Sequence, residues 1–332
     1  MRGDADIVHA AVDRLPAGPG VDRFRDARGR ALYLGRAVSL RRRVASYWLD
    51  LGDRPHLSAM VCAIARVEAL ECASEHEAAW LERSLLEHQL LPWNRTAGGQ
   101  EVEVYLRLDS AARSCGLTVA HDANGRGTHV EYFGPYLGGL RVRLAAAALL
   151  RAFPLDYAGY SAGAARELGR RRGADPADRL ALAAAIGAVL ARDPVAVAAV
   201  RAELIGRRAA AAADEAYEVA ARIQAELTAL DWVTATQRVV VLELGGADTV
   251  ACGWADGVLV RFAIRGGRIR SWNQHRASAA EASPLLAGTP PPWREFAEQN
   301  ARLAARLSAA SQGRGVRAQQ GCTSRATGRP GQ

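Results

Sequence analysis

The residues best suited to chemistry are arginines concentrated near the start of the chain. All 43 Lys and Arg residues of this 332-residue sequence are arginine, against 35 acidic residues. Between Arg14 and Trp48 there are nine arginines and two aspartates, almost enough to account for the whole net charge of +8. Guanidinium groups pair bidentately with phosphate, and counterions displaced from a polyanion add affinity. The cluster therefore indicates a polyanion-binding surface, with a solvated basic face as the alternative.

The five cysteines are not spaced like metal or redox sites. The sequence contains no CxxC or CxxxxC pair and no paired histidines at ligand spacing. Structural zinc sites and iron–sulfur clusters need such closely spaced ligands. We therefore expect no iron–sulfur cluster. We interpret all five cysteines as buried thiols: Cys62, Cys72, Cys115, Cys252 and Cys322.

Length and composition are those of a globular protein of about two domains, with 49% hydrophobic and 23% charged residues. No apolar run approaches the ~18 residues of a membrane span. The first residues, Met1 to Asp13, contain three aspartates and lack the basic and then apolar order of a secretion signal. These features predict a cytoplasmic protein without membrane contact.

A small antiparallel sheet with flanking helices is predicted to position the first arginines. Val21–Arg25 and Ala31–Leu34 are short extended runs, and the glycine between them suits a hairpin loop. The apolar run Ile64–Cys72 can add a third strand. A helix is predicted to begin after Ser39. Its apolar face consists of Leu40, Val44, Tyr47 and Trp48.

A second helix is predicted from Ser74 to about residue 90. Ser74 can cap its first turn while Glu77 reaches back, which makes a reciprocal capping box. Glu82 lies at the rim of the apolar stripe, where the helix surface meets solvent. Pro92 ends the helix.

The whole sequence is predicted to be α+β, because small sheets and helices also follow the first domain. Strand-like alternation covers 101–136 and helices cover 177–231, with breaks at Asp193-Pro194 and at Gly206. Between residues 239 and 272, turns of the hairpin type separate the strands of a β-meander.

These patterns predict five segments. They are an N-terminal domain at 14–98 with a small antiparallel sheet and flanking helices, a small sheet plus helix at 99–160, a helical region at 174–232, a β-meander with a terminal helix at 237–307, and a disordered basic tail at 308–332.

Several separated motifs resemble the GIY-YIG nuclease domain, in the form found in UvrC and its shorter relative Cho. Their order and spacing are those of the family, which makes the resemblance specific. The first-domain motifs are Leu15-Pro16-Ala17-Gly18-Pro19-Gly20-Val21-Asp22, Tyr33-Leu34-Gly35-Arg36, Leu40-Arg41-Arg42-Arg43-Val44-Ala45-Ser46-Tyr47, and Leu81-Glu82 through Pro92-Trp93-Asn94. The phrase Tyr132-Phe133-Gly134-Pro135-Tyr136 extends the resemblance to about residue 160.

The resemblance implies a site that hydrolyses phosphodiesters, which requires an oriented water, neutralised phosphoryl oxygens and help for the leaving oxygen. It implies that Tyr33 helps to activate the water, Arg43 stabilises the phosphate in the transition state, and Glu82 holds one divalent ion. A single carboxylate with open water positions favours Mg²⁺ or Mn²⁺.

Further residues of the site also follow from the resemblance. Arg36 and Asn94 match family positions near the phosphate, and Tyr47 matches a further tyrosine. Each candidate has an ordinary alternative, such as a strand tyrosine, a surface arginine or, for Asn94, the cap of a turn. The expected nucleic-acid contacts are Arg36, Arg41, Arg42 and Arg43.

The first motif departs from the family at Asp22, because the family has Gly-Val-Tyr where this chain has Gly20-Val21-Asp22. The family's tyrosine lies beside the second tyrosine in the sheet, so Asp22 is expected near the Tyr33 hydroxyl. A neighbouring negative charge raises the pKa of a phenol and makes Tyr33 harder to ionise. Asp22 could instead accept a proton itself or contact the metal.

As a whole, the resemblance implies a metal-dependent, structure-specific DNA endonuclease of nucleotide excision repair that nicks one strand 3′ of a lesion. The expected partners are double-stranded DNA with a lesion and a UvrB-like protein. The latter is expected to bind through 206–230, where Tyr217–Gln224 resembles the UVR motif, although an internally packed helical hairpin is the alternative. The four-cysteine segment of UvrC is missing.

Two other functions remain open. Asp22 and the missing cysteines favour a catalytically degenerate GIY-YIG protein that acts as a DNA-binding or repair-complex adaptor. A weaker alternative is an RNA-directed or self-resistance nuclease.

Overall fold

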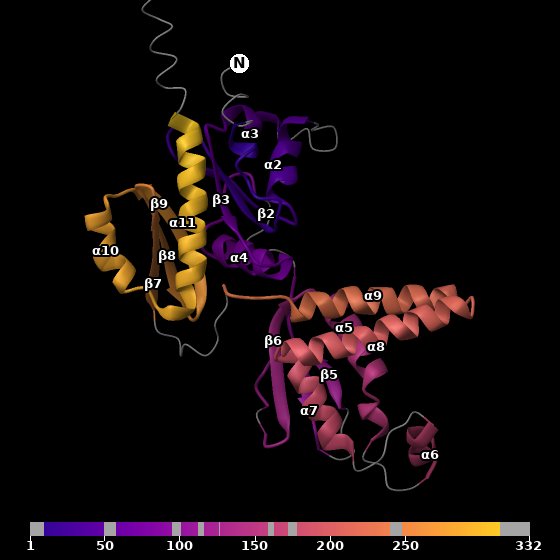
Figure 1. Ribbon diagram of the computed structural model, residues 1–332. Coiled ribbons are helices and arrows are strands. Elements are labelled where there is room, and N and C mark those ends of the chain that lie inside the picture. The colour runs from indigo at the N-terminus through magenta and orange to yellow at the C-terminus, as the bar shows by residue number, and fades with distance from the viewer. Residues whose placement is uncertain are drawn as a thin grey trace, which may run out of the picture. The chain divides into compact units, whose positions relative to one another are not determined.

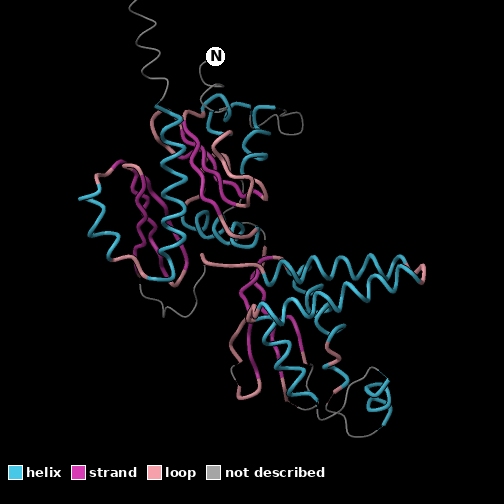
Figure 2. The backbone as a smooth tube through the Cα atoms, viewed as in Figure 1, coloured by secondary structure: helices cyan, strands magenta, loops and turns pink. Residues whose placement is uncertain are grey.

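The computed structural model describes residues 10–49, 58–94, 101–111, 116–125, 127–158, 163–171, 178–239 and 248–312. The chain forms two compact units (Figures 1 and 2). The first unit combines Met1–Gly99 with Thr236–Gln332, and the second is Gln100–Ala235. The predicted segments therefore do not form separate bodies, because 14–98 shares a unit with 237–307, and 99–160 shares a unit with 174–232.

The first unit begins with a three-stranded antiparallel sheet in the order β2-β1-β3. Its strands are β1 (Gly20–Arg25), β2 (Ala31–Ala37) and β3 (Arg66–Glu71), and β2 lies at an edge. The predicted strands and the hairpin between β1 and β2 are confirmed. Gly29 occupies the left-handed region in this hairpin, with φ of 78°.

Three helices accompany this sheet: α2 (Leu40–Leu49), α3 (Ser58–Ala63) and α4 (Glu75–His88). The predicted apolar face of α2 is confirmed, since Leu40, Val44 and Tyr47 are fully buried in a core that includes Phe24 of β1.

The start of α4 differs in part from the prediction. Ser74 Oγ accepts a hydrogen bond from the Glu77 backbone N–H at 3.0 Å, as expected of a cap. The Glu77 carboxylate, however, accepts from the backbone N–H of Ala73 and pairs with Arg238 at 3.2 Å. Glu77 is therefore a fully buried link to the C-terminal part of the chain rather than a solvated capping group.

That C-terminal part is a second antiparallel sheet with two helices. Strands β7 (Thr249–Ala255), β8 (Val258–Arg265) and β9 (Arg268–Arg276) form the predicted meander. Helices α10 (Ala279–Ala287) and α11 (Pro291–Gln312) follow.

Helix α11 joins the two sheets of the first unit, because it packs on β3 as well as on β7 and β8 (Figure 1). Its Leu303 and Leu307 enter the core that contains Phe24. Gly253 of β7 permits close approach, since a Cβ there would lie 2.0 Å from the Ala297 carbonyl oxygen.

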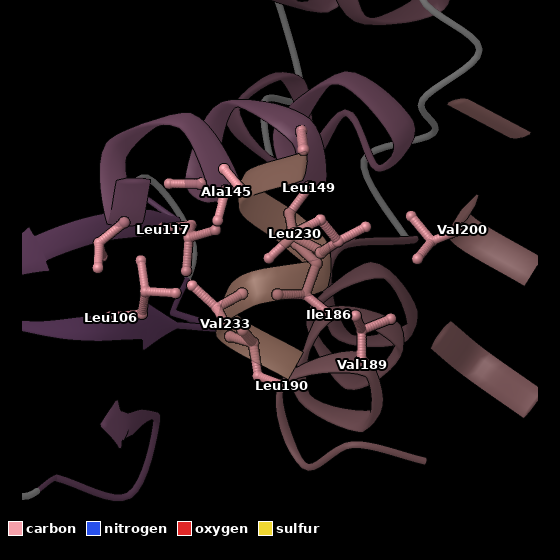
Figure 3. Packing of buried hydrophobic residues seen from close by; sticks show 14 of the residues in the cluster. Leu106, Leu117, Ala145, Leu149, Ile186, Val189, Leu190, Val200, Leu230 and Val233 are labelled. Atoms are coloured by element: carbon pink, nitrogen blue, oxygen red, sulfur yellow. The ribbon is translucent and has the colours of Figure 1, made fainter. Parts of the chain in front are cut away.

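The second unit packs helices against another three-stranded antiparallel sheet, in the order β5-β4-β6. Its elements are β4 (Glu103–Asp109), β5 (Leu117–Ala120), β6 (Val130–Leu137), α5 (Gly139–Ala152), the 3-10 turn η2 (Leu155–Tyr157), α6 (Gly163–Arg171), α7 (Arg179–Leu190), α8 (Pro194–Ala213) and α9 (Tyr217–Thr234). Side chains from the sheet and from helices α5, α7, α8 and α9 form its core, in which Figure 3 labels Leu106, Leu149, Ile186 and Leu230 among others.

Several boundaries differ from the sequence prediction. The predicted helix break at Gly206 is wrong, because α8 continues through it to Ala213 and the chain turns at Asp214–Ala216 instead. A predicted strand at 239–244 falls, from residue 240 on, outside the described residues. So does most of the predicted tail, whose residues 308–312 belong to α11.

Among the described residues, no single helix has both the length and the apolar composition of a membrane span. Helices α7 and α8 meet that criterion only when taken together, and they are bent by 105° relative to each other.

Candidate active site

Four predicted site residues meet on the face of the first sheet that α2 covers. Asp22 of β1 lies opposite Gly35 of β2, and Tyr33 precedes Gly35 by two positions, so all three share one face of the sheet. From α2, Arg43 Nε donates to Asp22 Oδ1 at 3.0 Å. Arg43 Nη2 donates to the hydroxyls of Tyr33 at 2.8 Å and Tyr47 at 3.1 Å.

This arrangement requires a glycine at position 35. A Cβ on Gly35 would lie 2.5 Å from Arg43 Nη2 and 2.9 Å from the Tyr33 hydroxyl oxygen. Both contacts are shorter than van der Waals separation, so any side chain would displace the guanidinium or the phenol. The glycine of the Tyr-x-Gly triplet thus makes room for the contact between Tyr33 and Arg43.

Asp22 is adjacent to the tyrosine pair, as expected, but its direct partner is Arg43. The aspartate is fully buried, and its Oδ2 has no hydrogen-bond partner in the described structure. Burial raises the pKa of Asp22 to about 6 against the opposing effect of Arg43, and the charge of Glu82 raises it further.

The same network shifts the pKa values of the groups around Asp22. Burial and the charge of Asp22 raise the pKa of Tyr47 well above its ordinary value. Burial works against the charged form of Arg43, but Asp22, the two tyrosines and Glu82 together outweigh it and raise the pKa of Arg43. Tyr47 therefore stays protonated, while Arg43 stays charged with 27% of its side chain exposed.

Glu82 and Asn94 lie at the outer edge of β2, where the strand has no neighbouring strand. Glu82 Oε1 accepts from the backbone N–H of Arg36 at 3.2 Å, and its Oε2 lies 3.4 Å from Arg36 Nε. Asn94 Nδ2 donates to the Leu34 carbonyl at 2.7 Å, and its Oδ1 accepts from the Leu34 N–H at 3.0 Å. Asn94 therefore completes the strand edge with both its amide oxygen and its amide nitrogen.

The remaining predicted nucleic-acid residues, Arg41 and Arg42, are both exposed on α2, and Arg41 donates from Nε to the Leu15 carbonyl at 2.9 Å. Arg23 and Arg25 point to the opposite face of the sheet, where they pair with the buried Glu68 at 2.6 and 2.8 Å. The basic segment of the sequence is thus divided between two faces.

The donors at this site suit a hard divalent ion that keeps most of its waters. Glu82 is a carboxylate with 24% of its side chain exposed. Among the described residues there is no group of three or more His, Cys, Asp or Glu that could hold a metal. Mg²⁺ and Mn²⁺ bind through one or two carboxylates plus water, whereas structural zinc needs four protein ligands. The residues present therefore fit Mg²⁺ or Mn²⁺.

Sequence reasoning missed two features that hold the site together. One is the steric role of Gly35. The sequence could have indicated it, because Gly35 follows Tyr33 by two residues and therefore lies on the same face of the strand. The other is Asn300 of α11, which is fully buried and bonds both backbone groups of Glu71 at the opposite edge of the sheet, at 2.7 and 3.2 Å. No local pattern indicates that contact.

Comparison with known proteins places these residues in a known family of domains. Residues 18–94 match the family model of the UvrC-like GIY-YIG domain. The chain is 32% identical over 274 residues to UvrABC system protein C of Thermobifida fusca, which covers 77% of this chain and 41% of that protein. The proteins of the same name from Pseudarthrobacter chlorophenolicus and Beutenbergia cavernae are 33% and 32% identical, over 77% and 82% of this chain.

The chain spans about two fifths of the length of these relatives. The similarity nevertheless continues well beyond the first sheet and includes much of the second unit. The chain therefore carries a UvrC-like GIY-YIG domain and is homologous to the UvrABC system C proteins over most of its length.

Proposed function

We propose that this protein is a metal-dependent DNA endonuclease of nucleotide excision repair, which nicks one strand on the 3′ side of a lesion. The observation that carries the proposal is that Arg43 of α2 contacts Tyr33 of β2 and Glu82 of α4 contacts the backbone of the same strand, within a UvrC-like GIY-YIG domain.

In the proposed reaction, the Tyr33 hydroxyl oxygen accepts a hydrogen bond from the attacking water and so orients and polarises it, and Arg43 stabilises the negative charge that develops on the phosphoryl oxygens. Glu82 would hold Mg²⁺ or Mn²⁺, which supplies Lewis-acid stabilisation when bound. Arg36 places a second positive charge beside Glu82, where it can contact the same phosphate.

Asp22 has a defined part in this proposal. Because it binds Arg43 through Nε, it leaves the Nη edge of the guanidinium directed at the two tyrosine hydroxyls. A buried carboxylate also offsets part of the charge of Arg43, which weakens its attraction for phosphate. The site is therefore ordered but less positive than one with a tyrosine at position 22.

The test is incision of an end-labelled duplex with one bulky adduct, in Mg²⁺ and Mn²⁺, with a UvrB protein added and omitted. We expect a nick 3′ of the adduct that is lost in Glu82→Gln and kept in Glu298→Gln, an exposed carboxylate of α11. Equal cleavage by the two variants would contradict the assignment of Glu82.

A second candidate function is a DNA-binding adaptor without cleavage, and the buried pair of Asp22 with Arg43 favours it. In that case no metal-dependent product forms, and duplex binding persists in Glu82→Ala. Asp22→Tyr separates the two candidates, because gain of cleavage in this variant indicates a degenerate nuclease. Loss of an existing activity indicates that Asp22 works in the site.

We further propose that a UvrB-like protein binds the hairpin of α8 and α9, within residues 206–230. The hairpin packs into the core of the second unit through Leu227 and Leu230, yet Tyr217 and Val219 remain 65% and 45% exposed. The variant Tyr217→Ser/Val219→Ser should abolish co-elution with UvrB without changing the melting temperature. Unchanged co-elution would assign the hairpin a purely internal role.

A further inference from the structure

An open cleft of about 800 Å³ lies in the first unit, on the sheet face opposite Asp22 and Arg43. Its floor is the side of β1 and β2 that carries Arg25 and Leu34. Its walls are the C-terminal end of α4 with the segment after it, and strand β9 of the second sheet. The cleft thus combines the nuclease-like domain with the C-terminal meander, for which the sequence suggested no chemical role.

The cleft has an excess of positive charge. Four arginines and no carboxylate are among its lining residues: Arg23, Arg25, Arg30 and Arg270. Two of the nearby carboxylates are shared, since Glu68 binds three guanidinium groups within 2.8 Å and Glu87 binds both Arg83 and Arg270. A third carboxylate, Asp26, pairs with Arg30 at 2.8 Å. Three carboxylates therefore hold six arginines in place and offset only part of their positive charge.

Two of these arginines can reach a ligand. Arg30 has 69% of its side chain exposed and Arg270 has 21%, whereas Arg23 is buried against Trp272. Arg30 lies at the β1–β2 turn and Arg270 lies on β9, so the two arginines come to the cleft from different sheets.

A β-bulge directs Arg270 into the cleft. Ala263 of β8 pairs with Ser271 and the next residue, Ile264, pairs with Ile269, so Arg270 is the extra residue of β9. The side chains of Ile269 and Trp272 are both buried on either side of it. Bulges re-aim side chains in this way and are frequent beside functional sites.

The cleft and the proposed active site share strand β2, although they lie on opposite faces of the sheet. Leu34 lines the cleft, and two residues further along the strand Arg36 contacts Glu82. Arg30 and Arg36 are six residues apart, which is ~20 Å of extended chain. That length corresponds to about six base pairs of duplex along its axis.

We infer that this cleft binds the sugar-phosphate backbone of the DNA flanking the cleavage position, with Arg30 and Arg270 as phosphate contacts. The inference rests on the proposed function, and it gives the C-terminal meander a role in substrate binding. Such contacts fix the position of the duplex without reading its sequence.

The test is equilibrium binding of the full chain to a labelled duplex, without divalent metal, over a range of salt concentrations. Arg30→Gln/Arg270→Gln should bind about tenfold more weakly at low salt. Its slope of log K against log salt should be about two units shallower than that of the wild type. Arg30→Lys/Arg270→Lys should keep the slope, because it keeps both charges.

The matched control is Arg261→Gln/Arg276→Gln, which removes two exposed arginines from the same sheet outside the cleft. Equal slopes for the cleft variant and this control would overturn the inference and leave the proposed nuclease untouched. Failure of the wild type to bind DNA at all would instead count against the proposed function. Loss of binding to an acidic peptide, with DNA binding unchanged, would assign the cleft to a protein partner and also overturn the inference.

Discussion

Asp22 pairs with Arg43 and so offsets part of the positive charge of the candidate active site. A carboxylate without exposed surface is costly in its ionised form, and one hydrogen bond from Arg43 offsets only part of that cost. The second oxygen has no hydrogen-bond partner in the described structure. The aspartate is therefore the residue whose replacement should change both the stability and the activity of the domain.

The stability of the protein should depend on pH through Asp22. Its pKa is about 6 in the folded state against 3.8 for the unfolded chain, so the folded state binds the proton more tightly. The resulting stabilisation is complete below pH 4 and is lost as the pH rises through about 6. Relative to Asp22→Asn, the wild type should lose roughly 3 kcal/mol of unfolding free energy over that range. Denaturant titrations of both proteins at pH 4, 5, 6 and 7 measure this loss. If the unfolding free energies of the two proteins change with pH in parallel, Asp22 is not the group responsible.

Gly35→Ala tests whether the contact between Tyr33 and Arg43 matters for cleavage. The added methyl group must displace one of the two side chains, and a shift of about 1 Å at a reacting group can lower a rate about 100-fold. We expect that loss in single-turnover incision. Gly206→Ala is the control, because its Cβ meets no atom within 4 Å and should stabilise α8 by ~0.5–1 kcal/mol without changing the rate.

At this scale the sequence predicted which residues meet, and the roles assigned to them stay predictions. The resemblance placed Tyr33, Arg43 and Tyr47 in one site, and the structure brings their polar groups within hydrogen-bond distance. It also placed Asn94 near the phosphate, yet the Asn94 amide is used by the backbone of Leu34. A side-chain amide that completes a strand edge has the same local sequence as one that binds a ligand.

At the scale of elements, asparagine side chains cover both edges of the first sheet. Asn94 bonds the outer edge of β2 and Asn300 bonds the outer edge of β3. Open strand edges invite pairing with other chains, so these contacts protect the sheet.

Asn300→Ala should destabilise the first unit by about 2 kcal/mol, because it leaves the partly buried N–H and C=O of Glu71 without the side chain that bonds them. Asn124→Ala, at an exposed position, should change stability by less than about 0.5 kcal/mol. Thermal melts measure the melting temperatures of the two variants. Equal values would show that the hydrogen bonds between Asn300 and Glu71 contribute little to stability.

The strands and most helices were predictable because their signals are local: alternating apolar residues, the cap at Ser74 and the glycine turns of the meander. The break placed at Gly206 was wrong because packing of α8 against α9 outweighs the modest helix penalty of one glycine. The bulge at Arg270 and the burial of Glu77 depend on partners far along the chain, so local patterns do not contain them.

At the scale of the whole molecule, the chain leaves the first unit at residue 99 and returns to it at residue 236. The sequence suggested separate segments because each has its own hydrophobic pattern. It did not indicate that α11 would supply Leu303 and Leu307 to the core formed by the first 70 residues.

The inserted unit should fold by itself. Its core consists of residues between Val104 and Val233, so it buries its apolar surface without the first unit. A fragment of residues 100–235 should show one cooperative thermal transition and dispersed amide resonances. A collapsed spectrum or the absence of a transition would show that the unit depends on the rest of the chain.

The central claim is that the edge of β2, with Tyr33, Arg43 and Glu82, performs phosphodiester cleavage. The most direct measurement is the single-turnover incision rate of Tyr33→Phe beside the wild type, on an adduct-containing duplex with Mn²⁺ and UvrB. The variant removes one hydroxyl from a ring that stacks on Phe24 and leaves that packing in place. We predict a rate at least about 100-fold lower with unchanged duplex affinity. Equal rates for the two proteins would contradict the account.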